Sequence, residues 1–535
     1  MLDAMTLSGL AMGLLSALVA AGVTFAVRSG PRWGRVYQGI DTWFHLKLAD
    51  VMRTQRGIPV RVEGFLVGDT YDYPPALSRL LSFLPRPFAE RYQWAMSPAT
   101  DVIHAVVIFA AAAWLWQNWA AGAVACAVYL AMPIPLSESS ELSPRSAGAL
   151  FVSITAIATI VFDRTGGWPW AACAMLAVAA AALTHRMSTQ TLIFLLALMS
   201  LAMRSLAYIG VLGGGLLLAI VLSRGLYLRV LRGHLAELRF WRQHVLRRDD
   251  ADPLKLLLGP RASRERAPLW RAGVTSAYGL IRNTPYICAV PIAYFSRWDT
   301  DKIAPLLWWA GIVYAAFLVT TYVRPLRFLG QGYRYLAHIA LPVSAVAAGY
   351  VTQLRTAPWY VHAGMGLLAV IAIRETAAHW QRIHRGGAAR ISDDLWAMLD
   401  DVRGLPRDGI VCVPMALASP VAYFTGRSVL RHYSSQAMNR LSSFYPLVSA
   451  PLDDLAREFD GSYIILHEGC SRGSALSMSG AREIARHGPY HLYEVAATSA
   501  AAAEPHASHA AGDAGEGKAR VTVDTQPKSV GRGRS

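Results

Sequence analysis

A carboxylate and an imidazole stand four residues apart, as Asp41 and His45, in the stretch Asp-Thr-Trp-Phe-His-Leu-Lys that follows the first apolar segment. A carboxylate at a membrane surface can orient or deprotonate a hydroxyl or amide, which then attacks an electrophilic carbon. Asp is also a favoured helix N-cap, so Asp41 could instead cap a helix over 42–53. We take Asp41 as the candidate catalytic residue.

Two acids three residues apart form a second candidate, Glu138 and Glu141, in a Ser-rich stretch that ends at Arg145. On a helix they would share one face and could hold a divalent cation, Mg or Mn, together with Asp41. A solvated helix end is the competing interpretation. Arg145 has the planar guanidinium that pairs with a phosphate through two parallel N–H bonds.

A third candidate is His185, which with Arg186 follows an apolar block. Ionisable groups close to membrane depth are energetically costly and usually serve a site. Snorkelling of a long side chain to the interface is the alternative, and it suits Arg186 better than His185. The sequence therefore predicts that His185 binds substrate.

The elements that must position these residues are membrane helices. Of the 535 residues, 54% are hydrophobic and only 16% are charged, and the apolar residues fall in blocks of membrane-spanning length. This pattern excludes an ordinary soluble enzyme and predicts a mainly α, polytopic bundle of about eleven spans. The predicted spans are 5–27, 101–117, 119–136, 147–162, 168–184, 189–203, 206–223, 274–295, 303–321, 335–351 and 357–373.

The net charge of +16 does not indicate a nucleic-acid partner, because the basic residues are scattered through loops between apolar blocks. Membrane topology and contacts with anionic lipid or phosphate explain such a distribution better.

Three regions are predicted along the chain. Residues 1–373 form the membrane domain, with a polar outer loop at 28–100. Residues 374–496 form a small soluble α/β domain, and the Ala-, Gly- and His-rich tail 497–535 is predicted to be disordered. Within the soluble domain we expect strands at 411–413, 463–466 and 492–495, and helices at 393–403, 452–459 and 479–487.

An N-terminus inside the cell and eleven spans would bring nearly all the candidate residues and the C-terminal domain to the outer face. The segment 224–273 would also lie outside with twelve Arg and Lys residues. The positive-inside rule disfavours that placement.

The Asp41–Lys47 stretch resembles the first outer loop of the oligosaccharyltransferase catalytic subunit and, more broadly, of the GT-C superfamily of membrane glycosyltransferases. The later Tyr73-Pro74-Pro75 is similar to the "YPP" stretch of the same loop. The resemblance implies that Asp41 lies at the catalytic centre and that His45 and Tyr73 bind substrate. It extends to the acidic pair, although the family carries a D-x-D/E motif where this chain has Glu-x-x-Glu.

The stretch around Arg334-Tyr335-Leu336 resembles the "E-x-R-[FY]-L…P" pattern of polyprenyl-phosphate-sugar mannosyltransferases, with Gly332 in place of the Glu. The resemblance implies that Arg334 contacts the lipid-phosphate leaving group and that Tyr335 lies in the same site. The positive charge would offset the negative charge that develops on phosphate oxygen.

The resemblance thus implies an enzyme that moves sugar from a polyprenyl-phosphate-linked donor to a protein, lipid or glycan acceptor. It would act on the outer side of a bacterial or archaeal cell membrane. We expect Asp41, one of the two acids, His185 and Arg334 to converge on one cavity. A transporter or lipid flippase without bond chemistry is the alternative, although transporters carry repeats and broken helices with charges at mid-membrane.

Overall fold

The computed structural model describes residues 7–34, 40–68, 70–244, 284–296, 298, 300–385, 391–445, 447–448, 450–470, 478–496 and 521–522. They form two compact units. The membrane unit comprises residues 1–36, 74–80 and 84–387, and the sheet unit comprises 37–73, 81–83 and 388–535.

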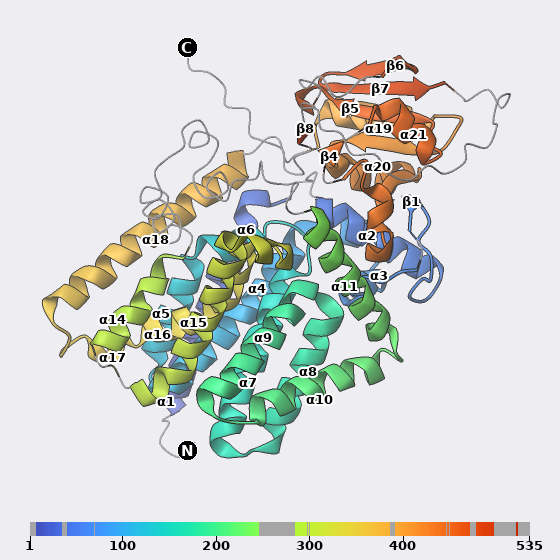
Figure 1. The fold of residues 1–535 in the computed structure, drawn as a ribbon. Helices are drawn as coiled ribbons and strands as arrows, with labels where there is room; N and C mark the ends of the chain where they lie inside the picture. The colour runs from blue at the N-terminus through green and yellow to red at the C-terminus, as the bar shows by residue number, and fades with distance from the viewer. Residues whose placement is uncertain are drawn as a thin grey trace, which may run out of the picture. The chain divides into compact units, whose positions relative to one another are not determined.

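The membrane unit is a bundle of helices (Figure 1). Its first half contains α1 (Leu7–Ser29), η1 (Gly30–Arg32), α4 (Arg86–Trp116), α5 (Trp119–Leu130), α6 (Pro133–Glu138), α7 (Arg145–Thr165), α8 (Trp168–Thr184), α9 (Arg186–Met203), α10 (Ala207–Leu222) and α11 (Leu226–His244). Its second half contains η3 (Pro285–Cys288), α14 (Ala289–Phe295), α15 (Thr300–Tyr322), η4 (Arg324–Leu329), η5 (Gly332–Ile339), α16 (Ala340–Ala348), α17 (Tyr350–Gln353) and α18 (Trp359–Arg385).

Seven helices of the described residues are long and apolar enough to cross a membrane, or eight if the bent pair α10–α11 counts as one span. Among the described residues this is fewer than the predicted eleven, and the segments Trp119–Leu130, Trp168–Thr184 and Pro285–Phe295 are apolar but shorter. Helix α5, with 12 residues, is about 18 Å long and falls short of the ~30 Å hydrocarbon core. Part of the predicted span 274–295 lies outside the described residues. The side of the membrane, inferred from eleven spans, stays a prediction.

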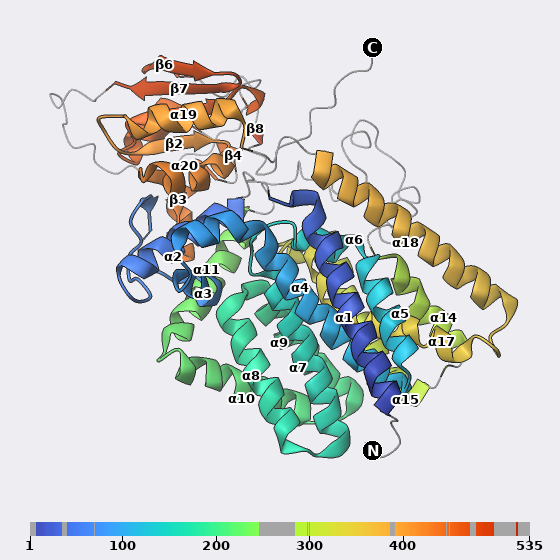
Figure 2. The same ribbon diagram turned by 180° about the vertical axis from the view of Figure 1, so that it is seen from behind.

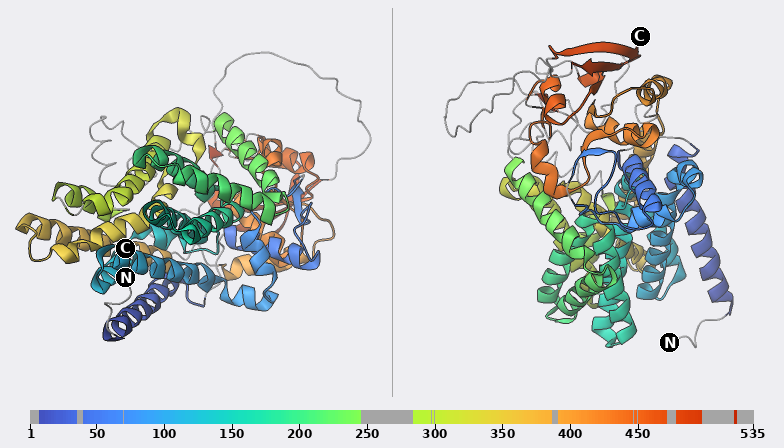
Figure 3. Two further views of the ribbon diagram at one scale, coloured as in Figure 1. Left: turned by 90° about the horizontal axis from the view of Figure 1, so that it is seen from below. Right: turned by 90° about the vertical axis from the view of Figure 1, so that its right-hand side faces the viewer.

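Small residues bring the helices of the bundle close together. Helix α1 packs alongside α4 and α5 (Figure 2) and lies at the edge of the bundle in both views of Figure 3. A Cβ on Gly122 of α5 would lie 2.9 Å from the carbonyl oxygen of Phe109 on α4. Cys126, one turn further on, donates its S–H to the Ala105 carbonyl at 3.2 Å. Close approach of this kind is how membrane helices associate without a hydrophobic driving force between them.

The sheet unit is a mixed six-stranded sheet with the order β1-β3-β2-β5-β7-β6. Its strands are β1 (Phe65–Val67), β2 (Ile410–Val413), β3 (Val429–His432), β5 (Tyr463–His467), β6 (Ala481–His487) and β7 (Tyr490–Val495). The strands β1, β3, β2 and β5 are parallel to their neighbours in that order. Strand β7 is antiparallel to both of its neighbours, β5 and β6 (Figure 1). A separate pair joins β4 (Leu447–Val448) to β8 (Val521–Thr522), and the rest of the predicted disordered tail lies outside the described residues.

The helices of this unit are α2 (Ile40–Thr54), α19 (Asp393–Arg403), α20 (Ala418–Thr425) and α21 (Leu452–Glu458), with the short η7 (Met415–Leu417), η8 (Ser435–Leu441) and η9 (Glu468–Cys470). Helix α3 (Ala76–Ser82) has residues in both units. The three predicted strands and the helices at 393–403 and 452–459 are confirmed. The predicted helix at 479–487 is wrong, because β6 occupies it and pairs with β7 through the turn at Gly488.

Strand β1 comes from the predicted outer loop and lies at the edge of the sheet, with Phe65 paired to Val429 and Val67 to His432 of β3. Residues 37–73 therefore group with the C-terminal sheet, whereas the sequence placed all of 28–100 with the membrane helices. The backbone hydrogen bonds between β1 and β3 join the early loop to the C-terminal part of the chain.

The buried Asp72 fastens this loop to the segment after β3. Its carboxylate accepts hydrogen bonds from the Ser434 hydroxyl (2.9 Å) and from the backbone N–H groups of Ser435 (2.9 Å) and Gln436 (3.1 Å). Asp72, which directly precedes the Tyr73-Pro74-Pro75 stretch, is therefore a structural residue.

Replacing Asp72 by Ala should lower the free energy of unfolding by about 1.5–3 kcal/mol, because it leaves the buried Ser434 hydroxyl and the buried Ser435 N–H group without an acceptor. Thermal unfolding of the detergent-purified protein would measure the loss. Asp454→Ala is the matched control, since Asp454 is an exposed carboxylate of the same unit that pairs with the surface Arg457. Equal melting temperatures for the two variants would contradict the structural role of Asp72.

Candidate functional site

Helix α2 carries the first two predicted site residues. It begins at Ile40, so Asp41 lies within the first turn, where a carboxylate is favoured by the helix dipole, and is half-buried. His45, one turn later, is buried, and its ring centroid lies 5.7 Å from that of Tyr73. Tyr73 is half-buried and also meets the edge of Phe44 at 5.8 Å. The sheet unit thus brings Asp41, His45 and Tyr73 into one region.

Aromatic packing fixes the start of α2. Trp43 is 1% exposed, and its ring centroid lies 5.2 Å from that of Tyr423 and 4.5 Å from that of Phe424, both on α20. The anchored Trp43 restricts the direction of its neighbour Asp41. A directed carboxylate is what a positioned base requires.

Arg431 of β3 is a candidate that the sequence did not single out. Its guanidinium carbon lies 4.5 Å above the Phe44 ring, and its Nη1 donates a hydrogen bond to the Ser419 hydroxyl. Burial lowers the pKa of Arg431, while the negative charge of Asp41 opposes that shift. This electrostatic interaction indicates that the carboxylate of Asp41 on α2 and the guanidinium of Arg431 on β3 lie in the same region of the sheet unit.

In the membrane unit, the acidic stretch does not form one helical face. Helix α6 ends at Glu138, which is 6% exposed and pairs with Arg145 at 3.3 Å between Oε2 and Nε. Glu141 lies in the turn that follows, and its carbonyl accepts a hydrogen bond from the Ser97 hydroxyl. The two acids therefore do not act as an i,i+3 pair.

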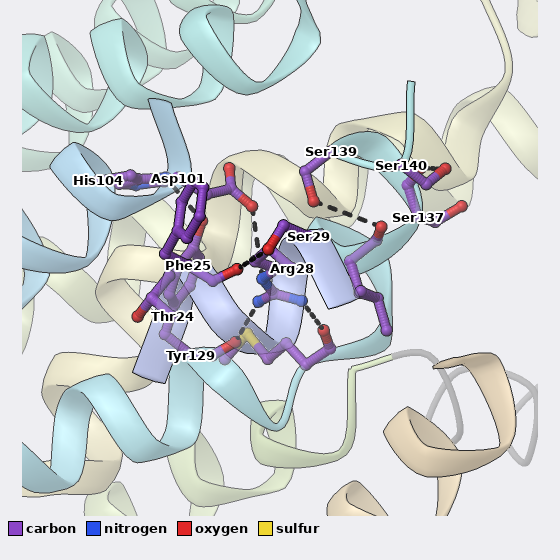
Figure 4. Close-up of polar contacts among 12 residues, drawn as sticks. Thr24, Phe25, Arg28, Ser29, Asp101, His104, Tyr129, Ser137, Ser139 and Ser140 are labelled. Carbon is purple, nitrogen blue, oxygen red and sulfur yellow. Dashed lines mark hydrogen bonds and ion pairs between the residues drawn. The ribbon is translucent and has the colours of Figure 1, made fainter. Parts of the chain in front are cut away.

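The membrane unit also contains a buried ion pair between Arg28 and Asp101. The Arg28 Nε lies 3.4 Å from the Asp101 Oδ2, and both side chains are at most 3% exposed. The Arg28 guanidinium also donates to the backbone carbonyls of Tyr129 (2.8 Å) and Met132 (3.5 Å), as Figure 4 shows. A small pocket lies beside the pair, and it is lined by Asp101, His104, Tyr129, Pro135, Glu138, Arg145, Ser146, Ala149 and Ala337.

A chain of polar side chains continues through the bundle from this pocket. The Tyr129 hydroxyl lies 3.3 Å from the His104 Nδ1, and the His104 Nε2 lies 2.8 Å from the Ser153 hydroxyl. A second chain contains the predicted His185. Its Nδ1 lies 2.9 Å from the Ser188 hydroxyl, which lies 3.0 Å from the Nε2 of the buried His338.

Arg334 and Tyr335, two predicted site residues, lie next to each other on η5 but differ in their contacts. Arg334 is half-buried, and its Nε is buried without a hydrogen-bond partner among the described residues. The Tyr335 hydroxyl, in contrast, donates to the Leu329 carbonyl and accepts from the Gln190 amide, both at 2.9 Å. Tyr335 therefore supports the fold of η4 and η5, and Arg334 retains a donor for a ligand.

Within the described ranges no group of three or more His, Cys, Asp or Glu side chains is placed to hold a metal ion. The pairing of Glu138 with Arg145 occupies one of the two carboxylates predicted for that purpose. Among the described residues, Glu138 and Glu141 are therefore not arranged together to hold a divalent cation.

The sequence missed Arg28, Asp101, His104 and Arg431. The signal for His104 was present, because an ionisable side chain inside an apolar block is unusual. Asp101 stands at the predicted start of a span, where a charge needs no explanation. In the structure α4 begins fifteen residues earlier, at Arg86, which places Asp101 well inside the helix.

No protein-family model matches the sequence, and no curated protein matches it either. The chain is similar to solved structures. Apo ArnT from Cupriavidus metallidurans matches with a TM-score of 0.56 and 12% identity, over 90% of this chain and 98% of that one. The same protein bound to undecaprenyl phosphate matches with a TM-score of 0.55 and 13% identity, over 94% and 100%.

The archaeal oligosaccharyltransferase AglB from Archaeoglobus fulgidus, in complex with an inhibitory peptide and a dolichol-phosphate, matches with a TM-score of 0.55 and 12% identity. The match covers 85% of this chain and 69% of AglB. The resemblance to the GT-C superfamily is confirmed at the level of the fold, and the chain is an integral membrane protein with the fold of the GT-C glycosyltransferases, a helical membrane bundle with a soluble domain.

Proposed function

We propose that this protein is a glycosyltransferase that moves a sugar from a polyprenyl-phosphate-linked donor to an acceptor on the extracytoplasmic face of the membrane. The observation that carries this proposal is the match over 94% of the chain to a structure that holds undecaprenyl phosphate. The dolichol-phosphate in the AglB structure supports the same class of lipid donor.

Arg334 is assigned to the donor. Its buried Nε has no acceptor among the described residues, and an anionic phosphate oxygen would supply one. When the bond between the anomeric carbon and the phosphate oxygen breaks, negative charge accumulates on the departing lipid phosphate, which a guanidinium stabilises. Arg145, at the start of α7 and half-buried, is assigned to the same class of contact, and His185 to a sugar hydroxyl.

Asp41 is assigned to the acceptor. It takes the proton of the acceptor hydroxyl or amide as that group attacks the anomeric carbon, and the lipid phosphate leaves with the bonding electron pair. We assign Arg431 a positioning role, because its guanidinium interacts electrostatically with Asp41. The half-buried Tyr73 is assigned to the substrate, and the buried His45 packs against its ring. No step is routed through a metal ion, because the described donor set does not fit one.

A transporter without bond chemistry is the second candidate, and one observation favours it. Arg28, Asp101, His104 and His338 are buried ionisable side chains within the bundle, a feature typical of transport proteins. Sugar transfer by the purified protein from a polyprenyl-phosphate sugar to any acceptor distinguishes the two, since a transporter would only redistribute the lipid.

Arg334→Ala should lower transfer from a polyprenyl-phosphate sugar by roughly 10²–10³, the usual effect of removing one donor from a developing anion. Arg334→Lys should restore only part of it, because an ammonium lacks the guanidinium fork. The control is Arg355→Ala, which removes an exposed arginine of the same unit. Unchanged turnover in Arg334→Ala, in a preparation where the wild type is active, would remove Arg334 from the mechanism.

A further inference from the structure

Helix α11 presents an exposed basic face that the proposed reaction does not use. The chain bends by 115° between the apolar helix α10 and α11. Leu226, Tyr227 and Val230 of α11 pack against Ala179 and Ala182 of α8. One face of the helix is thus fixed to the bundle, and α11 lies at its periphery in Figures 1 and 3.

The opposite face mixes arginine with leucine. At 3.6 residues per turn, positions 228, 232, 235, 239 and 242 fall within an arc of roughly 80°. All five side chains are exposed: Leu228 (42%), Arg232, Leu235 (45%), Arg239 and Arg242. We define these five residues as the basic face.

Among the described residues, the arginines of the basic face have no carboxylate to offset their positive charge. Glu237 is the acidic residue of α11, and its carboxylate lies 2.6 Å from Arg186 at the start of α9, away from the basic face. Across the described ranges no carboxylate lies within ion-pair distance of Arg232, Arg239 or Arg242. Three like charges on one helix face repel one another unless an anion lies among them.

The chemistry of the basic face identifies its partner. On the outside of a membrane bundle, arginine cannot face hydrocarbon, because a charged side chain there is expensive. The leucines between the arginines, in turn, need apolar surroundings. An anionic phospholipid satisfies both, since its phosphate accepts from the guanidinium groups while its acyl chains cover the leucines.

We propose that the basic face of α11 binds the headgroups of anionic phospholipids of the surrounding bilayer. The Arg186–Glu237 ion pair couples this lipid-binding helix to the start of α9, next to His185. Helix α11 also packs against η4, just before the segment that carries Arg334. The proposal concerns bilayer lipid and is independent of the glycosyltransferase proposal.

The test uses the full chain in lipid nanodiscs with spin-labelled phosphatidylglycerol and phosphatidylcholine. The measured quantity is the preference of the protein-bound lipid fraction for the anionic headgroup. Arg232→Gln, Arg239→Gln and Arg242→Gln combined should lower that preference several-fold, since one basic residue near an anionic surface contributes roughly five-fold. High salt should weaken the wild-type preference in the same direction.

The matched control removes three exposed arginines elsewhere in the membrane unit, Arg355→Gln, Arg374→Gln and Arg385→Gln, and should keep most of the preference. Leu228→Ser with Leu235→Ser should weaken lipid retention without changing the charge. The proposal is overturned if the triple variant of α11 keeps the wild-type preference for the anionic headgroup. It is also overturned if the control variant loses as much of that preference as the α11 variant. Full displacement of the labelled lipid by inorganic phosphate also overturns it, because it would show a site for a free anion.

Discussion

Asp41→Asn is expected to lower sugar transfer by roughly 10²–10⁴ while the protein still folds. The substitution keeps the size of the side chain and its hydrogen-bonding oxygen, but it removes the negative charge and the ability to accept a proton. Trp43 would still anchor the start of α2 against α20. The rate of transfer from a polyprenyl-phosphate sugar, measured in membranes and normalised to folded protein, gives the result.

Asp50→Asn is the matched control, because Asp50 lies on the same helix, is part-buried and pairs with Arg53 three residues later. It should leave transfer close to the wild-type rate. A purely structural Asp41 makes the opposite prediction, with normal transfer in Asp41→Asn and a loss of stability in Asp41→Ala. Full activity of Asp41→Asn would show that Asp41 is not the base.

The second large effect is on stability. Arg28→Ala should lower the free energy of unfolding by about 3–5 kcal/mol, because it leaves the Asp101 carboxylate buried in the bundle without its partner. The backbone carbonyls of Tyr129 and Met132 would also lose the hydrogen bonds that the Arg28 guanidinium donates to them. Denaturant unfolding in detergent, followed by tryptophan fluorescence, measures the change.

The double variant Arg28→Met with Asp101→Leu separates an ion-pair effect from a packing effect. It replaces both charges by apolar side chains of similar reach, and it should recover most of the stability lost in Arg28→Ala. Arg355→Ala serves as the exposed control. A midpoint for Arg28→Ala equal to that of the control would show that the buried pair contributes nothing.

The sequence predicted where most helices and strands lie better than it predicted how long the helices are. Hydropathy located apolar blocks correctly, but it counted α5 as a span although the helix has only 12 residues. The helix at 393–403 was correct because a Ser cap and an amphipathic repeat act locally, and the Ser392 hydroxyl accepts from the Leu395 N–H. Residues 481–487 have helix-forming side chains, yet pairing with β7 overrides that local preference.

Asp41 and Arg334 could be proposed from the sequence because each stands in a recognisable motif. Arg431 could not be predicted, because the sequence analysis expected no strand at 429–432. Only the parallel pairing of β3 with β1 brings Arg431 near the loop that carries Asp41 and Tyr73. The Arg28–Asp101 pair joins residues 73 positions apart on α1 and α4, and no local pattern reports such a contact. The sequence alone did not show which residues far apart in the chain come into contact.

The entry of β1 into the sheet has a consequence for biogenesis. The Asp72 contacts join residues more than 360 positions apart, so the early loop must wait for nearly the whole membrane unit to be synthesised before its partners exist. Such a distant closure slows assembly. A fragment that begins after the last membrane helix would lack β1 and expose the edge of β3 to pairing between copies. The soluble portion is therefore a poor candidate for separate expression.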